Sequence, residues 1–459
     1  MLRNRIQRIG ILVAGGLVFG LVVSSGWAVE MRTTSGKKTI IRRASLQAGD
    51  EKENAGKEET LPPPAPDAAA PVTPTPRQPA FTEPAFVQPG VEFEVGDGGC
   101  YDACVPTCCL PCLSGRLWTE VDFLLWWRKG RFFPPLVTTQ PNDAILPTAT
   151  ILFGGQRVDE SPRPGGRVEL GVWLGPCARF GLGGSFLALA DAPVNFSITD
   201  ADFSLFGRPF TNAATGTQTA QLIASDVANP QTTGQLDLRS TSEVLVSDAF
   251  ARWAIWRGCG HRLDFLAGYQ FARIDEDLRI DTFTQTTGTI FPTLAVTDVF
   301  SMRNEFHGGH FGLLGQYQFG RVGLELRAKF AFGNMRETAT ISGHRISQTA
   351  AAARFEANRG LLAMDVTNGG VHVQDDFSYM QDVGVKLSYC PVERLRVSLG
   401  YSLLYWSSVL RPGNQIDLLV DPNLLTNNPP VGNEVHHAFQ FNPKGMYVHG
   451  LNVGIEYNF

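Results

Sequence analysis

An excess of charge of either sign is what this sequence most clearly lacks. Its 459 residues include 39 Lys and Arg against 44 Asp and Glu, which gives a formal net charge of −5. Without a basic excess we expect no nucleic acid as a partner. Only 18% of residues are charged and the mean hydropathy is −0.05. These values exclude a wholly disordered chain and a membrane protein built from many apolar helices.

Long apolar runs are also scarce. The one long run, residues 9–23, follows Arg3, Arg5 and Arg8 and precedes Gly26-Trp27-Ala28, whose small residues suit a signal peptidase. This run is shorter than the roughly 20 residues that a spanning helix needs. Residues 1–28 are therefore interpreted as a secretory signal peptide, with a membrane anchor as the alternative. A mature chain that enters a membrane must then do so with strands.

Motifs that carry chemistry are missing as well. The sequence has no Gly-x-Ser-x-Gly, no phosphate-binding loop and no Cys-x-x-Cys-His for attached haem. His307 and His310 are three residues apart, so on a strand they face opposite sides and cannot chelate one metal. We therefore expect no enzymatic activity, no cofactor and no metal.

The segment that follows the signal peptide is low in complexity. Residues 61–90 hold ten prolines, which exclude a helix or a ladder and favour extended polyproline conformations. A short basic group at residues 37–43 precedes them. Residues 29–99 are thus predicted to be a disordered periplasmic leader. It is either a solvated linker without a partner or a tether that contacts the cell wall.

Eight cysteines in an exported chain indicate an oxidising compartment. Five of them cluster within residues 100–115, and three stand alone in short turn sequences further on. Zinc held by Cys109 and Cys112 is the alternative, but no second pair and no nearby His follows. We favour disulfides, with the pairing left open. The candidates are Cys100, Cys104, Cys108, Cys109, Cys112, Cys177, Cys259 and Cys390.

From residue 116 to the end, ten stretches alternate between two kinds of side chain, as strands do when their faces meet different surroundings. Short links at 175–178, 257–260, 318–321 and 390–393 alternate with long ones at 128–165, 191–240, 280–302, 333–377 and 407–446. This pattern predicts an all-β fold at residues 116–459. The fold is a transmembrane antiparallel up-and-down β-barrel of about ten strands, with short periplasmic turns and long outer loops. A hairpin hidden in a long loop would make twelve strands, and a water-soluble β protein is the alternative class.

Two further features bear on this barrel. The last run ends in Tyr457 and Phe459, and a terminal Phe after apolar residues at every second position is the signal that outer-membrane barrels present to their insertion machinery. Aromatic residues crowd the ends of the runs and are expected to form interfacial belts. They are Trp126, Trp127, Phe132, Phe133, Trp253, Trp256, Tyr317, Phe319, Tyr405 and Trp406.

The polar face of each run is predicted to face the lumen. Both signs of charge are interleaved on it, and a barrel of about eight strands is already filled by its side chains. A lumen crossed by ion pairs should therefore be narrow or closed. The predicted lumen-facing residues are Glu120, Asp122, Arg167, Glu169, Asp264, Gln270, His310, Glu325, Arg327, Lys329, Lys386, Arg396 and Glu456.

Several blocks of this region, in order along the chain, carry a family resemblance. They are residues 117–120, 123–127, 134–139, 262–269, 304–309, 324–329, 400–406 and 411–417, from Leu-Trp-Thr-Glu to Arg-Pro-Gly-Asn-Gln-Ile-Asp. Residues 115–459 thereby resemble the planctomycete β-barrel porin type 7 family. The resemblance implies an outer-membrane barrel with porin activity and brings no catalytic residues.

The function expected from these features is that of a protein of the cell outer membrane. It forms a narrow or largely plugged channel, or serves as a structural and surface-display barrel. Its expected partners are outer-membrane lipid, the barrel-insertion machinery and the cell wall through the leader; no pattern indicates an oligomeric state. One alternative is a hydrolase at the outer rim that uses Asp275, Asp277 and His307. Another is an adhesin or receptor that acts through the long outer loops.

Overall fold

The computed structural model describes residues 116–140, 143–174, 178–228, 230–425 and 439–459. The predicted signal peptide, leader and cysteine cluster lie outside these residues. Almost every regular element among the described residues is a β-strand, which confirms the all-β prediction. Helical structure is limited to α1 (Pro412–Gln415) and the 3₁₀ turn η2 (Pro422–Leu425). Neither of these helices, within the described part of the chain, is long and apolar enough to span a membrane.

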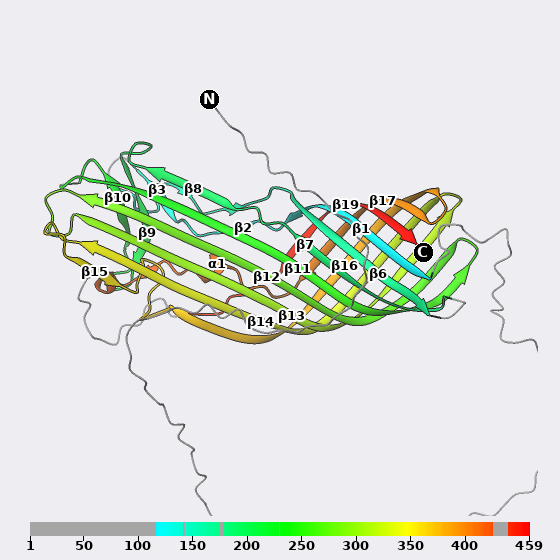
Figure 1. Ribbon diagram of the computed structural model, residues 1–459. Helices are drawn as coiled ribbons and strands as arrows, with labels where there is room; N and C mark the ends of the chain where they lie inside the picture. Colours follow the sequence, from blue (N-terminus) through cyan, green and yellow to red (C-terminus); the bar gives the residue numbers. More distant parts are fainter. Residues whose placement is uncertain (1–115, 141–142, 175–177, 229, 426–438) are drawn as a thin grey trace, which may run out of the picture. The chain divides into compact units, whose positions relative to one another are not determined.

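Ten antiparallel strands form a closed ring (Figure 1). β1 pairs with β19 from Trp118–Asn458 to Arg128–Val448, so the first and last strands join the two edges of the sheet. The predicted antiparallel barrel of ten strands is thereby confirmed. In ring order the strands are β1 (Leu117–Arg128), β6 (Arg163–Leu174), β7 (Phe180–Leu189), β11 (Thr232–Gly258), β12 (His261–Thr286), β13 (Thr293–Phe319), β14 (Val322–Gln348), β16 (Gly370–Val392), β17 (Leu395–Trp406) and β19 (Met446–Asn458).

Three of the predicted long loops are wrong. Residues 191–240, 280–302 and 333–377 are largely strand, because β11, β12, β13 and β14 each run for 26 or 27 residues. At about 3.3 Å per residue, each of these strands is roughly 90 Å long, against a hydrocarbon core of about 30 Å. The apolar outward face ends where a strand leaves the hydrocarbon, although its hydrogen-bonded ladder continues. The outward pattern therefore stops well before the strand does.

A hairpin does lie within the segment 191–240, but its two strands are not members of the ring. Strands β9 (Leu205–Asn212) and β10 (Gln218–Ser225) pair with each other, and β10 reaches β11 through a single pair of residues, so the ring has ten strands and not twelve. The remaining short strands line the same end of the barrel or extend its wall. They are β2 (Arg131–Phe132), β3 (Val137–Thr139), β4 (Thr150–Phe153), β5 (Arg157–Val158), β8 (Val194–Thr199), β15 (Arg354–Ala357) and β18 (Leu419–Val420).

Short connections gather at the opposite end, which we call the turn end (Figure 1). Two residues separate β11 from β12, β13 from β14, and β16 from β17. Gly260 in the first of these turns has a φ of +79°, and a Cβ there would meet the carbonyl oxygen of Gln318 at 2.6 Å. A side chain at this position would be strained and would clash, so the turn requires glycine.

β14 shows how the wall changes along the barrel axis. Near the turn end, its outward side chains are apolar and its inward ones charged; beyond Phe332 the outward ones become polar and the inward ones mostly apolar. The outward set runs from Leu324, Leu326, Phe330 and Phe332 to Asn334, Arg336 and Thr338. The inward set runs from Glu325, Arg327 and Lys329 to Ala331, Met335, Ala339 and Ile341. The first stretch suits a lipid surround and the second suits water.

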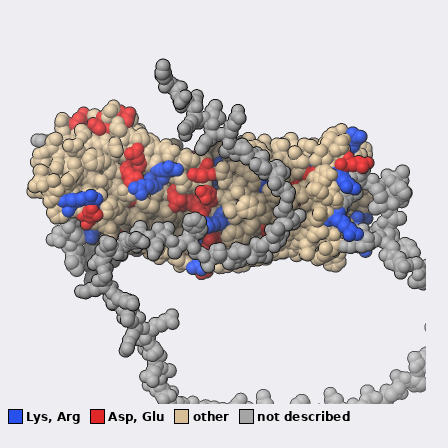
Figure 2. Space-filling model, in the orientation of Figure 1, with Lys and Arg blue, Asp and Glu red and all other residues tan. Residues whose placement is uncertain are grey.

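The surface reflects this change. Figure 2 shows charged side chains at the turn end and in a band about midway along the barrel, with few of them between. The intervening zone is the exposed apolar belt, to which Val121, Leu399, Val385 and Leu451 also belong, each more than two-fifths exposed. An exposed apolar surface of this extent is unusual on a water-soluble protein and is the surface that a bilayer covers.

The water-exposed half of the barrel is packed as a soluble domain would be. Inward side chains of the extended strands, such as Leu238, Ile280 and Phe300, meet side chains from the connections 129–162, 359–369 and 407–425. Phe133, Leu362 and Leu410 are the deepest contributors from those connections, each 0 or 1% exposed. The outer half is therefore a filled hydrophobic core and not an open vestibule.

The lipid-facing belt can be tested with one charge placed at two heights. Leu326→Arg sets a cation in the middle of the belt and should destabilise the barrel in a bilayer by about 2–4 kcal/mol. Val371→Arg sets the same cation on an outward position of the water-exposed half and should change stability by less than about 0.5 kcal/mol. Urea titration of both variants refolded in lipid vesicles measures the difference; equal effects would mean that the belt is not in lipid.

Candidate functional site

The barrel interior is the place where a solute or ligand would have to pass. At the level of the lipid-facing belt, polar and mostly charged side chains fill it, among them all of the residues predicted to face the lumen. Most are below 10% exposed, and Asp264, Asp122 and Gln270 are at or below 2%. Glu169, Glu325 and Glu456 retain 12–13% side-chain exposure. The interior at this height is thus polar but almost closed to solvent.

These charges are joined in ion pairs. Asp122 and Glu456 face their arginines from the neighbouring strand, whereas Glu169 and Glu120 are reached across the lumen. Arg167 bonds Asp122 through Nε at 2.8 Å, Arg327 reaches Glu169 at 3.2 Å, and Arg396 reaches Glu456 at 2.9 Å. Lys386 pairs with Glu120, the partner on a strand remote in sequence. A buried cation next to a carboxylate is stabilised only while its partner remains, so each pair fixes two strands to each other.

Four charged residues of this layer were missed by the sequence prediction. Asp248 and Asp382 both bind Lys329, the latter at 3.2 Å. Arg252 and Arg262 both bind Asp264. Their inward direction follows from parity, since Asp248 lies two residues from Val246 and from Phe250, which are both buried. The signal was present but weak, because the runs at 243–256 and 381–389 alternate less regularly than the others.

A layer of apolar side chains lies next along the axis, above the ion pairs. It includes Trp126, Phe306 and Trp406, each 0% exposed, together with Leu124 and Met335. Trp126 donates its indole N–H to Asn452 Oδ1 at 2.6 Å, which fixes the ring against the neighbouring strand β19. The expectation that Trp126, Phe133 and Trp406 belong to interfacial belts is therefore wrong. They sit on the inward face, where they fill space, while Trp253, Trp256, Tyr317 and Phe319 are well exposed.

An arginine cluster closes the interior beyond this layer, on the water side of the belt. Glu276, which is 0% exposed, receives Arg128 at 2.9 Å and Arg411 at 3.1 Å. Asp159 receives Arg128 at 2.9 Å, Arg131 at 3.0 Å and Arg163. Four guanidinium groups thus share two carboxylates. Asp159, Arg163 and Arg411 come from connections or their borders, where no alternation could reveal them.

The electrostatics of this cluster follow from its burial. Burial by itself raises the pKa of Glu276, but the nearby charges of Arg411, Arg128 and Arg131 outweigh that effect and lower its pKa to about 2. Burial is also the main cause that lowers the pKa of Arg128 to about 9, while Glu276 opposes it. Glu276 and Arg128 are both charged at pH 7. Through their ion pair and the one between Glu276 and Arg411, the cluster ties β1, β12 and the connection after β17 into one unit.

The residues proposed for a hydrolase at the outer rim do not form a constellation. His307 Nδ1 is hydrogen-bonded to the Tyr269 hydroxyl at 2.6 Å, and Asp275 is paired with Arg273 at 2.6 Å and Arg303 at 3.1 Å. Because His307 lies opposite Phe271 and Asp275 opposite Arg303, the two are separated by four residues along the sheet, about 13 Å. His307 and His310 face opposite sides of the wall, as the alternation predicts.

Two small cavities lie between the ion pairs of the described residues. They measure about 20 and 10 Å³, and each has room for about one water molecule. Among the described residues, no group of three or more His, Cys, Asp or Glu side chains could hold a metal ion.

A closed ring of tilted strands with an apolar outer belt and a charged interior defines the class of outer-membrane β-barrel proteins. The family model described as "Putative beta barrel porin-7 (BBP7)" matches residues 118–459. The chain belongs to this family, as the resemblance in the sequence had indicated.

Comparison with solved structures gives barrels of low sequence identity. The outer membrane protease OmpT of Escherichia coli is 11% identical, with a TM-score of 0.35, over 76% of this chain and 99% of that one. A FadL homologue of Pseudomonas aeruginosa is 10% identical, with a TM-score of 0.22, over 76% and 93%. The P. putida toluene transporter TodX is 9% identical, with a TM-score of 0.20, over 77% and 92%. A search of curated proteins gave no match.

The arginine cluster yields a stability prediction. Glu276→Gln removes one of two carboxylates that hold four buried arginines and should destabilise the barrel by about 3–5 kcal/mol. Asp281→Asn, which removes the partner of the exposed Arg279, should cost less than about 1 kcal/mol. Urea unfolding in lipid vesicles measures both.

The difference in stability between the wild type and Glu276→Gln should depend on pH. The pKa of Glu276 is lower in the folded barrel than its ordinary value of 4.5, so its stabilisation is fully present above pH 4.5 and is lost as the pH falls through about 2. The gap in unfolding free energy between the wild type and Glu276→Gln should therefore narrow over that interval. A gap that does not change with pH would show that the carboxylate charge is not what holds the cluster.

Proposed function

We propose that this protein is a largely closed outer-membrane barrel. It conducts small ions at most, and it acts chiefly as a structural and surface-display element. The observation that carries the proposal is the filling of the interior at successive levels: ion pairs, then the layer of Trp126, Phe306 and Trp406, then the arginine cluster. A hydrated solute would have to displace all three, and the buried charges would lose partners in the process.

The display role is supported by the length of the strands. β14 continues for roughly 16 residues past Phe332, the last outward aromatic of the belt, which is about 50 Å of strand. The extended half has its own hydrophobic core, so it would stand in water as a folded body. An adhesin would use the same outer surface. A hydrolase at Asp275, Asp277 and His307 receives no support from the positions of these side chains.

Insertion is proposed to use the end of the last strand. Phe459 is 58% exposed and its ring packs edge-on against Tyr457 at 4.6 Å. Its amide donates to the Leu117 carbonyl at 2.8 Å, so the terminal residue is part of the seam that closes the ring. The remaining partners that we propose are outer-membrane lipid around the belt and the cell wall, reached by the leader.

Conductance tests the closed interior. The wild-type protein, refolded and added to planar bilayers, should show no single-channel conductance larger than that of a narrow pore for small ions. The triple variant Trp126→Ala, Phe306→Ala, Trp406→Ala removes the apolar layer and should conduct measurably more, because three fully buried aromatic rings leave the lumen.

The control for this recording is Trp253→Ala, which removes an aromatic ring from the outer face and should leave the conductance unchanged. Both variants must still show the shift in gel mobility on heating that folded barrels display. Wide, stable openings of the wild-type protein would contradict the proposal.

We further propose that the cysteines form disulfides on the periplasmic side. Cys259 lies in the turn between β11 and β12, and Cys390 lies near the end of β16, so both are at the turn end. The chain also enters β1 there, since the Arg116 amide donates to the Phe459 carbonyl at 2.9 Å. The other six cysteines lie outside the described residues.

Alkylation followed by mass spectrometry tests the cysteine proposal. The unfolded but unreduced protein should gain little mass from iodoacetamide, and the same protein treated first with a reductant should gain mass at up to eight thiols. Omitting the unfolding step in a parallel sample separates thiols that are merely buried from thiols that are bonded. Eight alkylated thiols without reductant would disprove the disulfides.

A further inference from the structure

A hollow of about 420 Å³ lies on the outside of the wall at the turn end. It is lined by Arg179, just before β7, by residues 253–255 and Arg257 at the end of β11, and by Phe265 on β12. These elements are neighbours in the ring: the Ala254 amide donates to the Arg179 carbonyl at 2.8 Å, and Trp253 lies opposite Phe265. The hollow is thus part of the ladder itself and not of a separate loop.

A β-bulge shapes this hollow. The register of β11 against β12 shifts between Ala254 and Trp256, so β11 carries one extra residue here. Ile255 and Trp256, neighbours in the chain, are consequently both turned outward, with 58% and 63% of their surfaces exposed. Together with Trp253 they give an apolar floor that continues into the lipid-facing belt.

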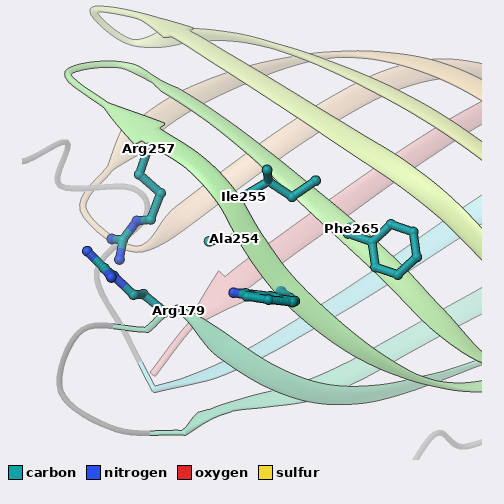
Figure 3. Close-up of a pocket in the computed structure, with 6 residues that line it drawn as sticks. Arg179, Ala254, Ile255, Arg257 and Phe265 are labelled. Atoms are coloured by element: carbon teal, nitrogen blue, oxygen red, sulfur yellow. The ribbon is translucent and has the colours of Figure 1, made fainter. Parts of the chain in front are cut away.

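Two guanidinium groups stand at the mouth of this floor. Figure 3 shows the side chains of Arg179, just before β7, and Arg257, on β11, converging, while Ile255 and Phe265 lie further along the wall. Both arginines also make interactions of their own within the protein. A guanidinium group has five N–H donors, so it can bind a phosphate in addition. Two arginines converging beside an apolar floor match an anion that carries hydrocarbon.

We propose that this hollow is a binding site for an anionic phospholipid of the periplasmic leaflet, such as phosphatidylglycerol. The phosphate would accept hydrogen bonds from Arg179 and Arg257, since guanidinium forks match phosphate oxygens. One acyl chain would lie along Trp253, Ile255 and Phe265. The height is appropriate, because short turns lie on the periplasmic side of outer-membrane barrels and the aromatic girdle marks the headgroup level. Basic pockets at this level are typical sites of anionic headgroups.

The experiment measures which lipid occupies the hollow. The full-length protein is refolded in phosphatidylcholine vesicles, and phosphatidylglycerol or additional phosphatidylcholine with dibrominated chains is titrated in. Bromine quenches tryptophan fluorescence on contact, and Trp253 lies in the hollow. The wild type should show a roughly thirtyfold preference for phosphatidylglycerol, given about 1 kcal/mol for each of the two arginines near a charged surface. Trp253→Phe should remove the selective part of the quenching, which assigns it to this place.

The variants separate the site from general surface charge. Arg179→Ala with Arg257→Ala should reduce the preference to about twofold or less, whereas the lysine pair at the same positions should keep part of it. The control, Arg279→Ala with Arg354→Ala, removes two exposed arginines of the water-exposed half and should retain the full preference. Heat-dependent gel mobility verifies that each variant is folded.

Three results would overturn the proposal. The first is equal quenching by both lipids in the wild type, and the second is an unchanged preference in the double alanine variant. The third is loss of the preference on addition of millimolar inorganic phosphate, which would assign the arginines to a free anion instead of a lipid. None of these readouts depends on whether the barrel conducts, so the lipid site and the closed interior stand or fall separately.

Discussion

The need to satisfy every backbone hydrogen bond in hydrocarbon governs this structure. A strand that crosses a bilayer has no water to bond its amides and carbonyls, so the sheet must close on itself. Closure is achieved by β1 and β19, the first and last ring strands, and it reaches the terminal Phe459. Once the ring is closed, the number of strands sets its diameter, and the interior of a ten-stranded ring is narrow enough for side chains to fill.

The way the interior is filled explains the sharp change of character along each strand. Within the belt, charged side chains face inward, and each charge is tolerated because a partner from another strand meets it. Beyond the belt, the outer face of the wall is exposed to water, and its apolar side chains face inward, as they do in a water-soluble β-sandwich. Asp298 is a charged residue buried in the otherwise apolar outer core. It is tolerated there because Arg208 and the amides of Leu362 and Ala363 bind it.

The alternation of residues was sufficient to predict the ten ring strands, their short turns and the direction of most side chains. Alternation did not predict the length of β11 to β14. Outward positions beyond the membrane carry polar residues such as Thr, Asp and Arg, as in 237–241, and a pattern based on apolar outward residues assigns such a stretch to a loop. It also failed for the inner position of Trp126 and Trp406, since residue type does not distinguish an interfacial ring from a packed one. Asp159 and Arg411, which complete the arginine cluster, meet Glu276 and its neighbours only through tertiary contact.

The unbroken passage of four strands from one end of the ring to the other has a mechanical consequence. A load applied at the far tip is carried by continuous ladders of hydrogen bonds down to the part held by the membrane, with no hinge between. The barrel is therefore stiff along its axis. A group attached to the end opposite the turn end would be held at a constant height and orientation above the membrane, which a flexible tether of equal contour length could not provide.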